Sequence, residues 1–178
     1  MLAKSITSES GEIKTANKPN GNGLSMVIFS GDMDKVLAAF IIAIGASAID
    51  MPVSMFFTFW GLNVLRSDLP AQLKSSKSLV EKMFGRMMPR GASKLHLSKM
   101  DMGGMGTLLM KREMKKKKVS DLPTLLKEAR ELGVKLVACE MSMDIMGIKI
   151  EELIPGIERV GVAIFIDSAK DSKMTLFI

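Results

Sequence analysis

The sequence predicts an α/β domain built on a mainly parallel β-sheet of about five strands flanked by helices. Short apolar segments that end in turn residues alternate with longer helical segments along the 178-residue chain, as is typical of β-α-β units. Hydrophobic residues make up 47% of the composition, which supports a packed core and excludes a disordered chain. The length fits one domain, which we expect to span residues 24–178.

The first β-α-β unit is predicted within residues 24–59. An apolar run over residues 24–29 ends in a Ser-Gly turn, as expected of a buried strand. Asp32 is a favourable N-cap for a helix over residues 33–49, which is apolar on nearly all sides and should be buried. A second strand follows over residues 51–59, and two strands joined by one helix imply parallel pairing with a right-handed crossover.

The C-terminal part of the chain is predicted to add further helices and three strands. Residue spacing predicts helical segments at residues 79–88, 107–117, 121–132, 140–147 and 151–154. Ser120 is the expected N-cap of the helix at 121–132, and Gly133 fits the position just beyond its end. Apolar runs predict strands at residues 134–139, 160–166 and 174–178, the last at an edge of the sheet.

Two regions differ from the rest in composition. Residues 1–23 are polar and contain no apolar segment, so we expect a disordered tail and not a secretion signal. Residues 66–118 hold 14 Lys and Arg against 4 Asp and Glu, a net charge of +10, whereas the rest of the chain has a net charge of −4. Eight of the 17 methionines lie between residues 83 and 114. We therefore interpret residues 66–118 as a basic, Met-rich helical insertion in the domain.

The residue counts exclude several classes of protein. Cys139, as the only cysteine, cannot form an internal disulfide or a cysteine zinc cage, and His96, as the only histidine, cannot build a multi-histidine metal site. We therefore expect no metal site and a reducing, cytoplasmic setting. The most apolar stretch, residues 36–65, is broken at residues 50–52, so each half is shorter than the roughly 20 residues of a membrane-spanning helix.

Cys139 is the strongest candidate for chemistry. It ends a predicted parallel strand, where open α/β sheets bind ligands, and a helix is predicted to follow directly. The free N–H groups of that helix would stabilise a thiolate or a persulfide anion, whereas the adjacent Glu140 would oppose it. Ser142 and Asp144 are the expected helix caps. The alternative is a structural cysteine, since free cysteines are among the most buried residues. The residues expected to support the site are Met141, Ser142, Met143 and Asp144.

The turns after the first two strands should lie at the same edge of the sheet as Cys139. Ser30 and Gly31 follow the first strand, where backbone N–H groups at Gly31 and Asp32 are placed to hold an anion, and Thr58 and Trp60 follow the second strand. The residues that we assign to the support of the same anion or substrate site are Ser30, Gly31, Thr58 and Trp60. The alternative is that they form ordinary strand-to-helix turns.

The basic segment contains three further features. The glycine-rich loop at residues 103–106 lacks the Lys-Ser/Thr ending of a P-loop, so it favours close packing over nucleotide binding. The methionines are interpreted as core or interface residues and not as soft-metal ligands. A run of cations would either be solvated or dock an acidic partner; the aromatic residues do not alternate with these lysines, which argues against nucleic acid. The run comprises Lys111, Arg112, Lys115, Lys116, Lys117 and Lys118.

Several of these motifs resemble the DsrE/DsrF-like superfamily, and most closely its DsrE2 branch. The resemblance covers residues 24–178 and rests on FFTFWGL at residues 56–62, MGGMG at 102–106 and VACEMSMDIMG at 137–147, with support from the first strand and the terminal LFI. It implies a DsrE/F-like sandwich around a mainly parallel sheet, commonly in homo-oligomers. The family's sulfur-carrying cysteine corresponds to Cys139.

The resemblance implies sulfur relay. Cys139 would accept sulfane sulfur as a persulfide or thiosulfonate from thiosulfate, a polythionate or a protein persulfide, and pass it to a small sulfur-carrier or rhodanese-like protein. Such thiol exchange needs no metal or organic cofactor. Some relatives use a second cysteine in the central segment, which this chain lacks.

Two alternatives belong to other functional classes. The first is a non-catalytic oligomeric scaffold whose basic, Met-rich segment forms an interface between subunits or, less favoured, touches a membrane surface. The second is a nucleotide- or anion-binding regulator that uses the turns at Ser30, Thr58 and Gly103. The missing phosphate loop argues against a nucleotide enzyme, and only the family resemblance favours relay over scaffold.

Overall fold

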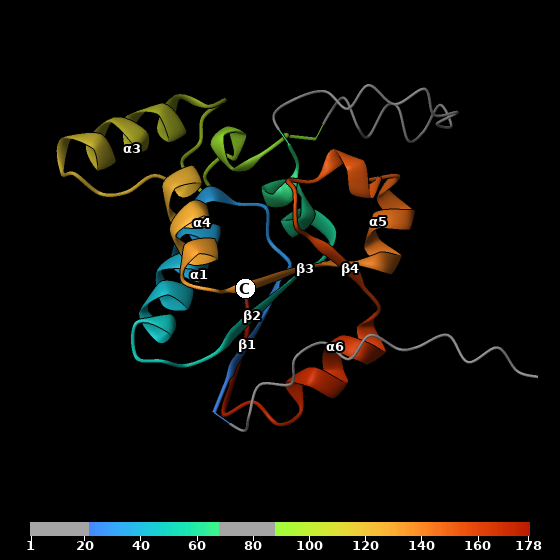
Figure 1. Cartoon of the computed structure of the whole chain (residues 1–178). Coiled ribbons are helices and arrows are strands. Elements are labelled where there is room, and N and C mark those ends of the chain that lie inside the picture. The colour runs from blue at the N-terminus through green and yellow to red at the C-terminus, as the bar shows by residue number, and fades with distance from the viewer. Residues whose placement is uncertain (1–21, 68–87) are drawn as a thin grey trace, which may run out of the picture.

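A five-stranded, fully parallel sheet forms the centre of the protein (Figure 1). The structure, a computed structural model, describes residues 22–67 and 88–178. The strand order is β4-β3-β2-β1-β5, so β4 and β5 are the edges and the predicted edge position of the last strand is confirmed. The strands are β1 (Leu24–Ile28), β2 (Val53–Phe57), β3 (Lys135–Cys139), β4 (Glu158–Val160) and β5 (Met174–Phe177).

The predicted first β-α-β unit is present. The helix α1 (Met33–Ser47) joins β1 to β2, and the two strands pair in parallel with Met26 opposite Met55. Asp32 is the N-cap residue of α1, as expected, but its side chain makes no capping bond and its own N–H donates to Ser30 Oγ at 3.1 Å. The parallel arrangement places the carboxyl ends of β1, β2 and β3 side by side, at the same end of the strands.

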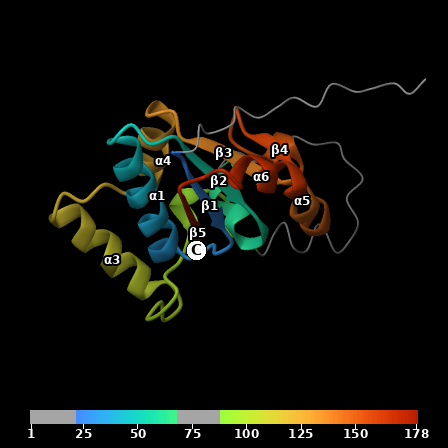
Figure 2. The ribbon, with the colours of Figure 1, turned by 90° about the horizontal axis from the view of Figure 1, so that it is seen from below.

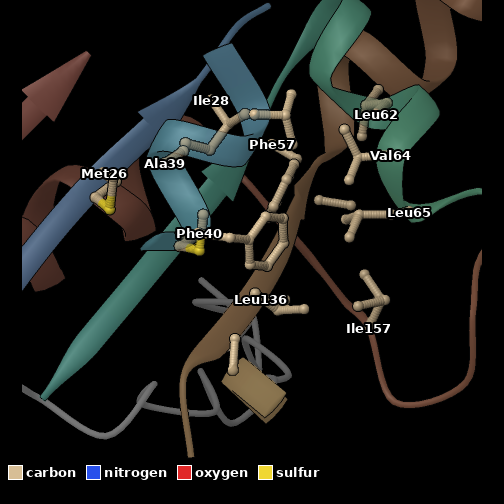
Figure 3. Packing of buried hydrophobic residues seen from close by; sticks show 14 of the residues in the cluster. Met26, Ile28, Ala39, Phe40, Phe57, Leu62, Val64, Leu65, Leu136 and Ile157 are labelled. Carbon is tan, nitrogen blue, oxygen red and sulfur yellow. The ribbon is translucent and has the colours of Figure 1, made fainter. Parts of the chain in front are cut away.

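Most of the hydrophobic core lies on one face of the sheet (Figure 3). The helices α1 and α4 (Leu122–Glu131) cover this face, and the short helix η1 (Phe59–Leu65) closes its end. Phe40 of α1 packs against Phe57 of β2 with ring centroids 6.3 Å apart. These side chains are removed from water almost completely, and at about 25 cal/mol per Å² such burial dominates the stability of a domain.

The opposite face carries a thinner layer. The helix α6 (Val162–Ala169) lies across it, on the far side of the sheet from α1 and α4 (Figure 2). Phe165 stacks on Phe56 of β2 with ring centroids 4.4 Å apart. The short helix α5 (Glu140–Met146) follows β3 without a break and lies beside η1.

The described part of the basic segment stands at the periphery. It contains the turn η2 (Ala92–Lys94) and the helix α3 (Met105–Lys116), which lies outside α1 and α4 (Figure 2). Thr107 is the one buried residue of α3. The helix expected at residues 79–88 falls almost entirely outside the described residues, as does the tail expected at residues 1–23 except for its last two positions. Within the described ranges, no helix is both long and apolar enough to cross a bilayer.

The predicted strand at residues 160–166 is wrong. β4 ends at Val160, Gly161 becomes an N-cap, and α6 begins at Val162. A short apolar run has the same appearance in a buried strand and in a helix, and here the helical form brings Phe165 onto the sheet.

Other boundaries also differ. The second strand ends at Phe57, because the chain turns into η1. Asp121, and not Ser120, caps α4, because its carboxylate accepts the Thr124 N–H at 3.0 Å. Gly133 does take a positive φ of 79°, as a residue beyond a helix end commonly does.

Candidate functional site

A chain of three polar side chains ends on the sulfur of Cys139. The Oγ atoms of Thr58 and Ser142 lie 2.7 Å apart, and the Ser142 hydroxyl donates to Cys139 Sγ at 3.3 Å. Because Ser142 has one proton and directs it at the sulfur, Thr58 is the donor in the bond between the two hydroxyls. All three side chains are buried, with Cys139 only 1% exposed. The prediction that the end of β2 meets Cys139 therefore holds for Thr58.

Local structure explains why these groups meet. Cys139 is both the last residue of β3 and the N-cap residue of α5. Ser142 lies three positions later, so one helical turn returns its hydroxyl to the sulfur. The prediction that Ser142 and Asp144 cap this helix is wrong, because α5 starts directly at Glu140 and both residues lie inside it.

An apolar layer covers the sulfur. Cys139 belongs to the small buried cluster on the α6 face of the sheet. Val160 lies opposite Cys139 in the parallel pairing of β3 and β4, and Phe165 comes from α6. A reagent therefore reaches the sulfur only when part of this layer moves. The cluster comprises Phe56, Val137, Cys139, Val160 and Phe165.

Arg159 completes the surface beside the cysteine, and sequence reasoning missed it. Its guanidinium lies 2.8 Å from a carboxylate oxygen of Glu140 and 2.9 Å from one of Asp144. The charge of Glu140, which would oppose a thiolate, is thus paired with a cation. Only the pairing of β4 with β3 brings Arg159 to this place, so no local sequence signal identifies it.

The remaining predicted support residues lie apart from the sulfur. Met143 is buried in the main core, and Met141 is 51% exposed on the surface. Ser30, Gly31 and Trp60 line a different cavity, of about 490 Å³, which Cys139 does not line. A side chain at Gly31 would come within 2.8 Å of the Trp60 carbonyl oxygen, so this glycine permits a close approach of two turns.

The glycine-rich loop serves close packing, as predicted. A Cβ at Gly106 would lie 1.8 Å from the Met100 carbonyl oxygen. Asp101 organises the loop by accepting from the Gly104 N–H at 3.0 Å and from the Thr107 hydroxyl. The bond from Thr107 is the main cause that lowers the pKa of Asp101 below its usual 3.8.

The predicted basic run divides into two groups. Lys111, Lys115 and Lys118 line a cavity of about 640 Å³ between α3, α1 and α4. Arg112, Lys116 and Lys117 do not line it. No three His, Cys, Asp or Glu side chains gather into a possible metal site among the residues that the structure describes.

A buried ion pair was also missed by sequence reasoning. Arg66 and Glu152 are 1% and 4% exposed at their side chains and lie 3.2 Å apart. Burial is the main cause that lowers the pKa of Arg66 below its usual value. The pair joins the chain after η1 to the turn η3 (Ile150–Glu152), so we assign it to the stability of the fold.

Known proteins are similar to this chain over most of its length. A model of the DsrE/DsrF/DrsH-like family matches residues 21–177. The uncharacterized protein YrkE of Bacillus subtilis (strain 168) is 50% identical over 154 residues, which cover 86% of this chain and 95% of that protein. The sulfur carrier protein DsrE2 of Allochromatium vinosum is 33% identical over 159 residues, which cover 87% of this chain and 97% of that protein.

A solved structure supports the fold alone. The crystal structure of the ychN protein from E. coli superposes with a TM-score of 0.50 at 11% identity and covers 88% of this chain and 99% of its own. Both have the α/β arrangement with a parallel sheet flanked by helices that the sequence predicts. From the family match and the identity to DsrE2, the chain belongs to the DsrE/DsrF/DrsH-like family.

Proposed function

We propose that the protein is a sulfur-relay protein that carries sulfane sulfur on Cys139 and passes it to the thiol of a partner. The observation that carries the proposal is the hydrogen bond from Ser142 to Cys139 Sγ at the carboxyl end of β3. The identity to a protein named a sulfur carrier supports the chemistry. The donor hydroxyl is suited to a thiolate or a persulfide anion, because hydrogen bonds to charged acceptors are about twice as strong as neutral ones.

The first step is attack of the Cys139 thiolate on a sulfane sulfur. With thiosulfate, a new S–S bond forms on Cys139, the bond to the sulfonate sulfur breaks, and sulfite leaves with the electron pair. With a protein persulfide, the thiolate of the donor protein leaves instead. With tetrathionate as the polythionate, Cys139 keeps a thiosulfonate, the central S–S bond breaks and thiosulfate leaves with the electron pair. None of these steps requires a metal or an organic cofactor.

The second step needs a thiol from another chain. A partner thiolate attacks the outer sulfur of the Cys139 persulfide, and Cys139 leaves as a thiolate. The chain has no second cysteine, so no thiol of the same subunit can resolve the persulfide. A small sulfur-carrier or rhodanese-like protein in the cytoplasm is the proposed partner, and a homo-oligomer is the proposed state.

Burial of the sulfur sets how the exchange proceeds. Cys139 is 1% exposed and shares a buried cluster with Val160 and Phe165, so we expect exchange to follow a local displacement of α6 or of β4. Small anions and partner proteins therefore react at a rate that scales with the fraction of molecules in which the sulfur is accessible, and a thiol in a short unstructured peptide reacts faster.

Intact-mass spectrometry tests the proposal. The reduced protein is incubated with thiosulfate, tetrathionate or polysulfide beside the Cys139→Ser variant. We expect an adduct on the unsubstituted protein alone, and dithiothreitol should remove it. An adduct that persists in Cys139→Ser contradicts the proposal, as does a folded protein that forms no adduct with small donors or with a persulfidated rhodanese.

The burial of Cys139 favours a second candidate, a non-catalytic oligomeric scaffold with a structural cysteine. An inert thiol in the folded protein, with full activity of Cys139→Ser in cells, would support this candidate.

A further inference from the structure

A groove with an apolar floor and one cationic wall runs between α1, α3 and α4, and we call it the α3 groove. Its volume is about 640 Å³. Met33 and Leu37 of α1 and Met114 of α3 contribute to the floor. The groove lies on the α1 and α4 side of the sheet, and Cys139 belongs to the cluster on the other side. The inference below is therefore independent of sulfur transfer.

The cations of the groove form a row. Lys111, Lys115 and Lys118 all line it from the α3 side. Lys111 and Lys115 lie one helical turn apart on α3, and Lys118 follows just beyond the end of the helix. One N–H of Lys111 donates to the Ser93 carbonyl oxygen at 2.7 Å, which leaves two for a ligand. Asp121 also lines the groove and interacts with Lys111, so the lining holds three lysines against one carboxylate and carries a net positive charge.

We propose that the α3 groove binds an amphipathic helix of a partner protein whose apolar stripe is flanked by acidic residues. An apolar floor beside a row of cations is complementary to such a helix, which repeats its side chains at i, i+4 and i+7. A fatty acid would bring one carboxylate and leave two of the lysines without a counter-charge. An uncharged helix would leave the whole row unmatched.

The other cations of α3 provide a matched control. Arg112, Lys116 and Lys117 belong to the same helix end but do not line the groove. Replacing either set of three cations by Gln changes the net charge of the protein equally. A general attraction between a basic protein and an acidic peptide would respond equally to both sets, whereas binding in the groove responds to the lining set.

Fluorescence anisotropy with the full-length protein tests the proposal. The probe is a labelled synthetic peptide of about 18 residues, long enough to form a helix, with a leucine stripe flanked by glutamates. Substitution of Lys111, Lys115 and Lys118 by Gln is expected to weaken binding about tenfold, and the matched control set by less than about threefold. A lysine-flanked version of the peptide should bind only when the three lining lysines are replaced by Glu. Circular dichroism confirms that each variant is folded.

Methionine methyl signals in NMR spectra locate the peptide. We expect Met33 and Met114 to shift on binding and Met141, which lies outside the groove, to remain unchanged. The proposal is overturned if the glutamate peptide does not bind, or if both triple variants weaken it equally. It is also overturned if dodecanoate displaces the peptide and depends on the same lysines, since the groove would then take a single-headed amphiphile.

Discussion

Removing the Ser142 hydroxyl tests the chemistry at Cys139 most directly. In Ser142→Ala the sulfur loses its donor at 3.3 Å, and the buried Thr58 hydroxyl loses its partner at 2.7 Å. Hydrogen bonds to charged groups contribute about 1 kcal/mol more than neutral ones, and 1.4 kcal/mol corresponds to a factor of ten. We therefore expect the rate of Cys139 sulfuration by thiosulfate at neutral pH to fall about fivefold.

The same substitution changes the free energy of unfolding by a separate route. An unpaired buried hydroxyl costs about 1–3 kcal/mol, and the better helix propensity of alanine offsets about 0.5 kcal/mol. A net loss of about 1 kcal/mol lowers the Tm by about 2–4 °C in a chain of this size. Thr58→Val keeps the bond from Ser142 to the sulfur, so it should lower stability to a similar degree but change the sulfuration rate less than about twofold.

The double variant Thr58→Val/Ser142→Ala separates the two effects. It removes both hydroxyls, so it should lose less stability than the sum of the losses in the two single variants. Its sulfuration rate should stay as low as that of Ser142→Ala. Rates are measured by mass spectrometry under a single donor concentration, and stability by urea unfolding. A sulfuration rate in Ser142→Ala that stays within twofold of the unsubstituted protein would refute the assigned role of this hydroxyl.

Three further substitutions test the apolar layer around Cys139, the buried ion pair and the stability of the fold at low pH. Phe165→Ala should lower stability by about 3 kcal/mol and raise the rate of Cys139 alkylation at least tenfold; an unchanged rate would show that this layer does not control access. Glu152→Gln leaves a buried arginine without its counter-charge and should lower stability by about 3 kcal/mol in urea titration, and a loss below 1 kcal/mol would contradict the ion-pair assignment. The hydrogen bond from the Thr124 hydroxyl is the main cause that lowers the pKa of Asp121 below its usual 3.8. The ionised Asp121 carboxylate therefore stabilises the fold above pH 3.8, and this stabilisation is lost as the pH falls through the lowered pKa. Acid unfolding of Asp121→Asn followed by circular dichroism should therefore show a shallower loss below about pH 4.

Alternation of apolar runs and turn residues was enough to predict the sheet. The runs that became β1, β2 and β3 are flanked by turns and pair as expected, because each is buried and too short for a core helix. The run at residues 160–166 has the same composition but forms a helix. Its helical form depends on the stacking of Phe165 on Phe56, which lies more than 100 positions earlier in the chain. Local pattern does not contain that contact.

The candidate site was predicted in part for a related reason. A parallel sheet gathers its strand ends at one edge, and this rule brought Thr58 to Cys139 correctly. The rule does not say to which face each turn residue points, so Ser30, Gly31 and Trp60 were assigned to the cysteine although they line another cavity. Arg159 was missed because its partners depend on the register of β4 against β3.

The two faces of the sheet place different demands on the same fold. The α1 and α4 face carries the extended core, and its opening would unfold the domain. The α6 face is covered by a single short helix with Val162, Ile164 and Ile166 between 42% and 58% exposed, so few of its apolar contacts are lost when it moves. Regions with few buried contacts open at a smaller free-energy cost than the global unfolding. On the proposed function, a thiol in the buried cluster on the α6 face would be protected most of the time and reached by local opening, which is the behaviour that a carrier of reactive sulfur requires.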